Sequence, residues 1–351
     1  MTERPQAPKP TPAERLTRLE REYRGLESKV VLAEIKDRVE DLESNVNGTL
    51  QQVKDLRNKG YLYEPDLEER ALELRKQWAK LRPGLAKEVD DQRGRLEKAK
   101  KPVDVMIRGA RAGGVTQAKA VDKLEAGLGD LEAEYRTAEK SIQGMYDGFS
   151  SRLSKLRSHL QEVKWMMEQG AESAFDWLPN EGILRAVSAN WVRNQEDEPR
   201  GVLFLTDQRI LFERKETVAT KKVLFITTEK EKIQKPLLEI ALPSIRQTKA
   251  ENKGLMGHED HLYLECDSEA PLPRVHFHLD GQDCELWARK IQRAIRGEFD
   301  DQRIEPISEE EEARLQNAPT KCSACGATFS SPILRGQREL ACSYCGSVER
   351  L

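Results

Sequence analysis

The sequence has few aromatic residues and no long hydrophobic run. Aromatic side chains make up 6% of the 351 residues, and hydrophobic residues make up 38% against 34% charged. That balance is too polar for one large globular core and favours long, solvated helices. The longest apolar runs are four residues, as at 30–33 and 202–205, so the sequence predicts no transmembrane helix.

The chain also lacks an excess of charge and a visible secretion signal. Lys and Arg total 58 against 61 Asp and Glu, so the bulk charge indicates no polyanionic partner. Residues 1–11 are polar and rich in proline, and we expect them to be disordered. Four of only six cysteines form two C-x-x-C pairs, which is typical of a metal site in a reducing compartment. We therefore expect a cytoplasmic protein of bacterial type.

Residues 12–168 carry apolar side chains at alternating spacings of three and four, between charged flanks. This pattern is typical of a coiled coil. The strongest seam runs through residues 121–163 and includes Ile142, Met145 and Phe149. The pattern is interrupted at 58–65 and 109–115, and Pro83–Gly84 is expected to kink or break the second helix. Because these interruptions are short, we expect an antiparallel helical hairpin or three-helix coiled coil, used as a spacer or for self-association.

Residues 175–297 contain short β-type runs separated by turn residues. The seven runs are Ile183–Val192, Val202–Thr206, Arg209–Glu213, Val223–Thr227, Leu237–Lys249, His261–Cys266 and Arg274–Leu279. An amphipathic helix follows, whose predicted buried residues are Leu286, Trp287, Ile291, Ala294 and Ile295. Trp287 has the largest apolar side chain of this face, so we expect it to close one open end of a bent sheet.

Three stretches of this region carry a resemblance to a known family. They are Gly182-Ile183-Leu184, the two runs joined by Thr206-Asp207-Gln208-Arg209, and Leu237–Ile245. Over about 120 residues they resemble the GRAM branch of the pleckstrin-homology (PH) superfold. The resemblance implies a seven-stranded β-domain with a C-terminal helix. It also implies phosphoinositide head groups or proteins as partners, with Lys and Arg of the first strand-to-strand loop holding the lipid.

That first loop, Arg193–Arg200, contains Glu196, Asp197 and Glu198, which disfavours an anionic lipid there. The alternative lipid or phosphate contact is the basic cluster of Arg214, Lys215, Lys221 and Lys222. Each basic residue near an anionic surface contributes about 1 kcal/mol. A solvated loop and a protein contact remain as the other interpretations of this cluster.

The cysteine pairs are the most specific signal in the chain. Cys322 and Cys325 are separated by sixteen residues from Cys342 and Cys345, and a glycine follows each pair. Four thiolates make a closed tetrahedral site for one structural Zn²⁺, and residues 318–351 resemble a zinc ribbon. The cysteine spacing alone would also allow iron as the bound metal. Arg335, Arg338 and Arg350 beside Tyr344 leave a nucleic-acid contact open, next to a protein-docking or purely structural role.

The remaining cysteines and the histidines of the β-domain have simple structural explanations. Cys266 and Cys284 are expected in the core of the β-domain. His276 and His278 share one strand face, which an exposed polar surface explains, although a second metal site with His258 and His261 stays open. The chain has no phosphate-binding loop, dinucleotide motif or metalloprotease helix, so nothing in it supports an enzyme.

The sequence therefore predicts a multidomain α + β protein. Its parts are a disordered tail (1–11), a long antiparallel helical coiled coil (12–168), a PH/GRAM-like domain (175–297), an acidic linker (298–317) and a zinc ribbon (318–351). We expect a non-enzymatic adaptor that forms homo-oligomers through the coil and docks to a protein partner or an anionic membrane surface. Peripheral attachment at the inner face of the membrane remains open. The alternative is a nucleic-acid-associated protein whose ribbon contacts DNA or RNA, and an enzyme's regulatory subunit remains a third class.

Overall fold

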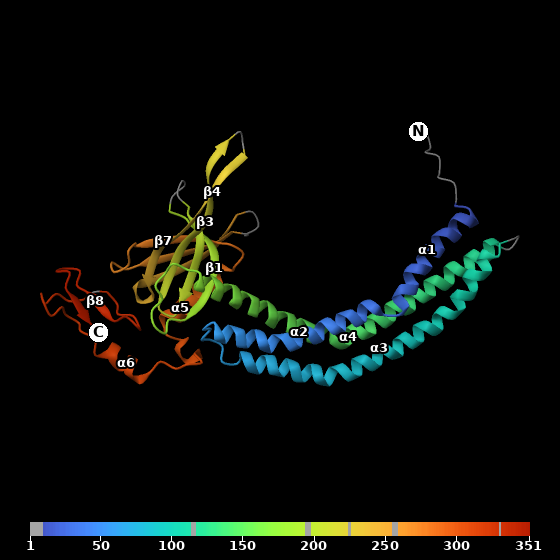
Figure 1. The fold of residues 1–351 in the computed structure, drawn as a ribbon, viewed down its shortest axis with the longest axis horizontal. Helices are drawn as coiled ribbons and strands as arrows, with labels where there is room; N and C mark the ends of the chain where they lie inside the picture. Colours follow the sequence, from blue (N-terminus) through green and yellow to red (C-terminus); the bar gives the residue numbers. More distant parts are fainter. Residues whose placement is uncertain (1–9, 114–116, 194–197, 224–225, 255–258, 330) are drawn as a thin grey trace. The chain divides into compact units, whose positions relative to one another are not determined.

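The computed structural model describes residues 10–113, 117–193, 198–223, 226–254, 259–329 and 331–351 (Figure 1). Between 218 and 231 it describes the backbone and not the side chains. The chain divides into two compact units. One comprises Met1–Gln52 and Glu68–Ser158, and the other comprises Val53–Leu67 and His159–Leu351.

Long helices make up the first unit and extend into the second. They are α1 (Pro12–Val30), α2 (Ala33–Asn58), α3 (Leu67–Arg111) and α4 (Gln117–Ala171). Thr11 caps α1 in a capping box with Glu14, which satisfies backbone N–H groups that the first turn leaves unpaired. Leu32 adopts a positive φ of 55° between α1 and α2. None of the described helices is both long and apolar enough to cross a membrane.

Ion pairs give the directions of the helices in the first unit. Arg15 of α1 pairs with Asp122 near the start of α4, so α1 and α4 run parallel. Lys100 of α3 pairs with Glu27 of α1, and Arg111 farther along α3 pairs with Glu20 earlier in α1, so α3 runs antiparallel to both. The apolar seam lies between the helices, and Leu128 is only 3% exposed. The long helices agree with the sequence prediction.

Two details of the helical prediction are wrong. α3 is not broken at Pro83 but continues through it as one helix; Pro83 is exposed, and its missing N–H removes only one helical hydrogen bond. The seam of α4 passes through Tyr146, which is 6% exposed, and not through Met145, which is 37% exposed. A step of four after Ile142 is as compatible with a helix face as a step of three.

The second unit contains one seven-stranded antiparallel sheet in the order β4-β3-β2-β1-β7-β6-β5. The strands are β1 (Ile183–Trp191), β2 (Arg200–Thr206), β3 (Arg209–Val223), β4 (Ile226–Ala241), β5 (Ile245–Lys253), β6 (Glu259–Cys266) and β7 (Arg274–Leu279). Helix α5 (Cys284–Ile295) follows β7. Seven strands and a C-terminal helix agree with the PH-like arrangement expected from the sequence.

Three predicted strands have clearly different bounds. The run Arg209–Glu213 continues to Val223 as β3. The run Val223–Thr227 is no separate strand, because Val223 is the last residue of β3 and Ile226 is the first of β4, and the two pair; residues 224–225 lie outside the described residues. The run Leu237–Lys249 is divided into β4 and β5 by a 3₁₀ turn at Leu242–Ser244. Pro243 in that turn has no backbone N–H for a sheet ladder, which explains the division.

Helix α5 covers the core of the sheet as predicted. Asp283 caps it by accepting from the N–H groups of Glu285 and Leu286. Trp287 is fully buried, and its Nε1 donates to Oε1 of Gln282 at 2.8 Å. The helix buries Cys284, Trp287, Ile291 and Ala294, whereas the predicted Leu286 and Ile295 are half-buried.

The chain after α5 has regular structure in the region expected to be an acidic linker. It contains a 3₁₀ turn at Asp300–Gln302 and helix α6 (Glu309–Gln316), which Ser308 caps. Strands β8 (Glu339–Ala341) and β9 (Val348–Arg350) form a small antiparallel pair.

Candidate functional site

The four paired cysteines come together in space. Cys322, Cys325, Cys342 and Cys345 place their sulfur atoms within 4.8 Å of one another. The Sγ atoms of Cys322 and Cys345 are 3.7 Å apart, and those of Cys325 and Cys342 are 3.6 Å apart. Two of the cysteines are buried and two are exposed.

The two cysteine pairs have the same backbone geometry. The N–H of Gly326 donates to the carbonyl of Cys322, and the N–H of Gly346 donates to the carbonyl of Cys342, both at 2.9 Å. Both glycines have a φ of +73°, which a residue with a Cβ adopts only at a cost. These two turns place the sulfur atoms on a common centre.

The electrostatics of the cluster favour a cation. Backbone N–H groups of Cys325 and Ala324 lower the pKa of Cys322 to about 7. The N–H groups of Cys345 and Tyr344 likewise lower the pKa of Cys342. The N–H of Ala327 lowers the pKa of Cys325, but the three neighbouring sulfur atoms raise it to about 12. The neighbouring sulfur atoms therefore oppose ionisation of all four thiols, and a cation at their centre would favour it.

The sulfur spacing fits a tetrahedral metal. A Zn–S bond of about 2.3 Å implies sulfur atoms roughly 3.8 Å apart at the corners of a tetrahedron. The two sulfur–sulfur distances of 3.7 Å and 3.6 Å are close to this value. The four residues are therefore compatible with a zinc site.

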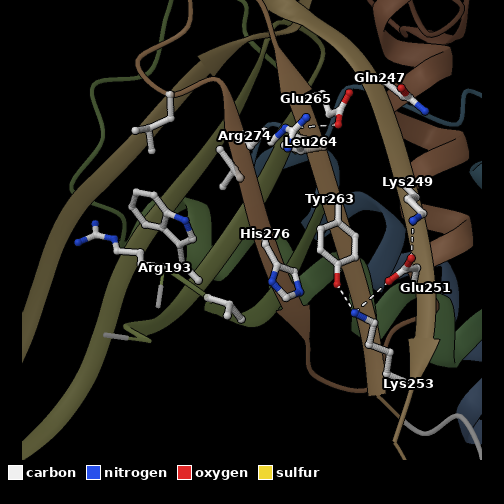
Figure 2. A pocket seen from close by; sticks show the side chains of 14 residues that line it. Arg193, Gln247, Lys249, Glu251, Lys253, Tyr263, Leu264, Glu265, Arg274 and His276 are labelled. Atoms are coloured by element: carbon white, nitrogen blue, oxygen red, sulfur yellow. Dashed lines mark hydrogen bonds and ion pairs between the residues drawn. The ribbon is translucent and has the colours of Figure 1, made fainter. Parts of the chain in front are cut away.

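A second candidate site is a groove of about 950 Å³ on the odd-numbered face of β5 and the neighbouring strands (Figure 2). Its described lining includes four cations (Arg193, Lys249, Lys253 and Arg274) and two carboxylates (Glu251 and Glu265). Lys249 lies opposite Tyr263, which lies opposite His276 on the next strand, so one row of side chains crosses three strands. The cations of the groove outnumber its carboxylates, although more of its lining surface is apolar than polar.

Contacts within the groove arrange its charges. Glu251 pairs with Lys249 at 2.5 Å and with Lys253 at 3.0 Å, which lowers the pKa of Glu251 to about 2. Lys253 also donates to the Tyr263 hydroxyl at 2.6 Å (Figure 2). The guanidinium of Arg193 lies 3.8 Å from the centre of the Trp191 ring.

The histidines form a stack rather than a cluster of ligands. The rings of Tyr263 and His276 stack with centres 4.1 Å apart, and His261 stacks on His278 at 5.0 Å. Nδ1 of His261 and Nε2 of His276 share a hydrogen bond of 2.8 Å. Burial, together with the positive charges of His261 and Lys253, lowers the pKa of His276 to about 4. His276 is therefore uncharged near neutral pH. His258 lies outside the described residues.

The basic residues predicted for lipid or phosphate contact lie on β3. Arg214 pairs with Glu216, and Lys215 pairs with Glu172 at 2.7 Å. Lys221 and Lys222 belong to the same strand, but their side chains lie outside the described part of the structure. The acidic loop residues Glu196 and Asp197 also lie outside it. The lipid role of this basic cluster stays a prediction.

Sequence reasoning missed the groove. The signal that could have found it is the alternation along β5, where Gln247, Lys249, Glu251 and Lys253 all fall on one face. Alternation alone does not identify a groove, because a solvated strand has the same pattern.

Comparisons with known proteins give structural likeness only. No family model matches the chain, and no curated protein matches it. The Vps36 N-terminal PH domain shares 17% identity at a TM-score of 0.24, over 36% of this chain and 87% of that one. The DH/PH domains of p115-RhoGEF share 12% identity at a TM-score of 0.21, over 77% and 94% of the two chains. The structure of human RhoA in complex with a DH/PH fragment of PDZRHOGEF gives 10% identity at a TM-score of 0.25, over 76% of this chain and 93% of that one. At these scores, no function is transferred from them.

Proposed function

We propose that this chain is a non-enzymatic cytoplasmic adaptor. Its seven-stranded domain docks to a partner through the groove, its segment with the four paired cysteines is a zinc ribbon, and residues 12–168 form a coiled coil that provides reach and self-association. The observation that carries the docking role is the groove itself, which presents four cations against two carboxylates in a hollow of about 950 Å³.

The shape and charge of the groove favour an acidic protein segment as the docking partner. A flat membrane surface meets only the rim of a hollow, whereas a protruding polypeptide segment can enter it. Lys249 is 62% exposed and Arg274 is 80% exposed, so both can reorient toward carboxylates of a partner. Such rim cations mainly accelerate association and make it sensitive to salt.

Charge reversal tests the docking role. A variant with Lys249→Glu, Lys253→Glu and Arg274→Glu is compared with one carrying Glu at 214, 215, 221 and 222. Poly-glutamate serves as the acidic probe, next to phosphatidylserine vesicles and a single-stranded oligonucleotide. We expect salt-sensitive binding of poly-glutamate that is lost in the groove variant and retained in the other.

Other outcomes would redirect the proposal. Vesicle binding that is lost only in the variant at 214–222 would establish the membrane role predicted from the sequence. Oligonucleotide retention without poly-glutamate binding would favour the nucleic-acid alternative.

The zinc centre is tested by elemental analysis of the purified full-length protein. We expect about one zinc per chain, bound by Cys322, Cys325, Cys342 and Cys345. When bound, the metal would supply structural cross-linking of two turns with no open coordination position. Cys342→Ser should release it, whereas Cys266→Ser, outside the cluster, should not. Metal-free wild-type protein would contradict the proposal.

Self-association is tested by sedimentation equilibrium of the full chain. The apolar side chains of the helical seam, such as Leu19, Leu74 and Leu128, are buried against other helices of the same chain. Oligomers would therefore use the outer helix faces. A concentration-independent monomer mass would remove self-association from the proposal and leave the docking role intact.

A further inference from the structure

One buried carboxylate joins several distant parts of the second unit. Asp207, in the turn between β2 and β3, is 2% exposed at its side chain. Its Oδ2 accepts from Nη1 of Arg303 and from Nη2 of Arg335, each at 2.6 Å. Its Oδ1 accepts from the backbone N–H of Gly182 at 3.1 Å. Asp207, Arg303, Arg335 and Tyr63 are here called the Asp207 cluster.

The Asp207 cluster reaches the loop between α2 and α3. Nη1 of Arg303 donates to the Tyr63 hydroxyl at 3.3 Å, and the N–H of Ile304 donates to the Leu62 carbonyl at 2.8 Å. The Tyr63 ring also lies against Gly182, where an added Cβ would come within 2.4 Å of the hydroxyl oxygen. Arg303 therefore helps to hold the α2–α3 loop, next to Arg57, which donates to the carbonyls of Tyr61, Tyr63 and Glu64.

Burial raises the pKa of Asp207, while Arg335, Tyr63, Gly182 and Arg303 oppose that rise. Removing one cation from a buried carboxylate costs much more than removing an exposed ion pair, because the remaining charge is left without solvent. Arg335 is thus an important counter-ion for Asp207.

Arg335 lies in the spacer between the two cysteine pairs. The spacer is held at three further points, one on the β2–β3 turn and two on the chain after α5. Nε2 of Gln208 donates to the Arg335 carbonyl at 3.1 Å, the N–H of Gly336 donates to Oε1 of Glu311 at 2.6 Å, and Nη1 of Arg335 donates to Asp300 at 2.8 Å. Gly336 has a φ of +75°, and an added Cβ would lie 2.6 Å from the Pro179 carbonyl oxygen. This contact requires the spacer in one defined conformation.

A segment of this size buries too little apolar surface to fold without a cross-link. Metal binding to the cysteines would therefore fix the spacer, and with it the guanidinium of Arg335. A segment without metal would leave Asp207 with Arg303 as its one remaining cation among the described residues.

We propose that the C-terminal cysteine segment is a metal-dependent latch, in which metal binding holds Arg335 on Asp207 and thereby orders the α2–α3 loop and the chain around Gly182. This inference rests on the zinc centre proposed above. The latch couples the metal content of the C-terminal segment to the packing of residues 61–64, 180–182 and 300–304.

Coupling of this kind is reciprocal, so breaking the latch must weaken metal binding by the same factor. The affinity of the full-length protein for Zn²⁺ is measured by competition with a chromophoric chelator. We expect Arg335→Gln to weaken zinc binding by about 5- to 100-fold. Arg338→Gln, an exposed arginine of the same segment, should leave the affinity unchanged.

A second measurement needs no variant. Hydrogen exchange of the wild-type chain is compared with zinc and after chelation. We expect faster exchange at 61–64, 180–182 and 300–304 after chelation, and unchanged exchange in α3 near Leu96. Unchanged exchange at the three latch segments, together with equal zinc affinity of wild type and Arg335→Gln, overturns the latch. A wild-type protein that binds no zinc overturns the zinc centre itself, which distinguishes the two failures.

Discussion

Trp287 shows how one side chain of α5 completes the core of the sheet domain. It is fully buried, and its indole nitrogen has a partner in Gln282. We expect Trp287→Ala to lower the free energy of unfolding by about 3–5 kcal/mol, because a large cavity remains and Gln282 loses one of its hydrogen bonds. Denaturant unfolding of the full chain measures the loss. Leu286→Ala, at a half-buried position of the same helix, should cost less. A loss of under about 1 kcal/mol at Trp287 would contradict its role in the core.

Gly336 combines a left-handed backbone with a close contact to Pro179. Gly336→Ala should therefore be more destabilising than the backbone conformation alone explains. Gly281→Ala is the matched control, because Gly281 has a φ of +65° and open space around its Cα. The control should cost roughly 1–2 kcal/mol, and Gly336→Ala clearly more. Equal losses in thermal unfolding would show that the spacer does not need its contact with Pro179.

At the residue scale, the sequence predicts what is local. The cysteine cluster was predictable because two short spacings place two sulfur atoms each, and one metal needs four. The Asp207 cluster was not, because Arg303 and Arg335 are 96 and 128 residues away from their partner. Nothing in the local pattern around Asp207 distinguishes a buried turn aspartate from a solvated one.

Helix α3 offers a prediction at the scale of one element. Pro83 lies inside the helix with its ring exposed, so it removes a backbone hydrogen bond and contributes little packing. We expect Pro83→Ala to raise the free energy of unfolding by about 1–3 kcal/mol. Pro102→Ala, at an exposed position of the same helix, should change stability in the same direction. Destabilisation by both substitutions would mean that the helix needs the bends that proline causes.

Strand bounds show where patterns mislead at this scale. The apolar residues at 223–227 predicted one strand. In the structure Val223 ends β3 and Ile226 begins β4, and these two residues pair with each other. The run 237–249 is apolar and alternating almost throughout, but Pro243 ends one strand and a new one begins at Ile245. The number of strands still equals the predicted seven, because one predicted strand is absent and another is divided into two.

The molecule as a whole should lose stability in acid. Hydrogen bonds from Arg314, together with the N–H of Gly336, lower the pKa of Glu311 from 4.5 to about 2, although burial opposes this. Because the folded pKa is the lower one, the stabilisation is fully present above about pH 4.5 and is lost as the pH falls toward about 2. Glu311→Gln should therefore lower the Tm near neutral pH, and its difference from wild type should shrink over that range.

The control for this titration is Glu310→Gln, at an exposed position of the same helical turn. Its difference from wild type should be small at every pH. A Glu311→Gln difference that stays constant down to about pH 2 would contradict the contribution of this carboxylate.

The long sequence separations within the Asp207 cluster also set the order in which the chain can complete its fold during synthesis. Strands β2 and β3 emerge early, and with them the Asp207 carboxylate, whose partners Arg303 and Arg335 have not yet been made. Translation must add 96 residues before Arg303 is available and 128 before Arg335 is. Until then the turn at Asp207 stays hydrated or open, because closing it over an unpaired charge is unfavourable. Synthesis of the cysteine-rich segment is thus the step after which the β2–β3 turn can close, and a ribosome that stalls before it leaves a sheet domain with an unfinished interior.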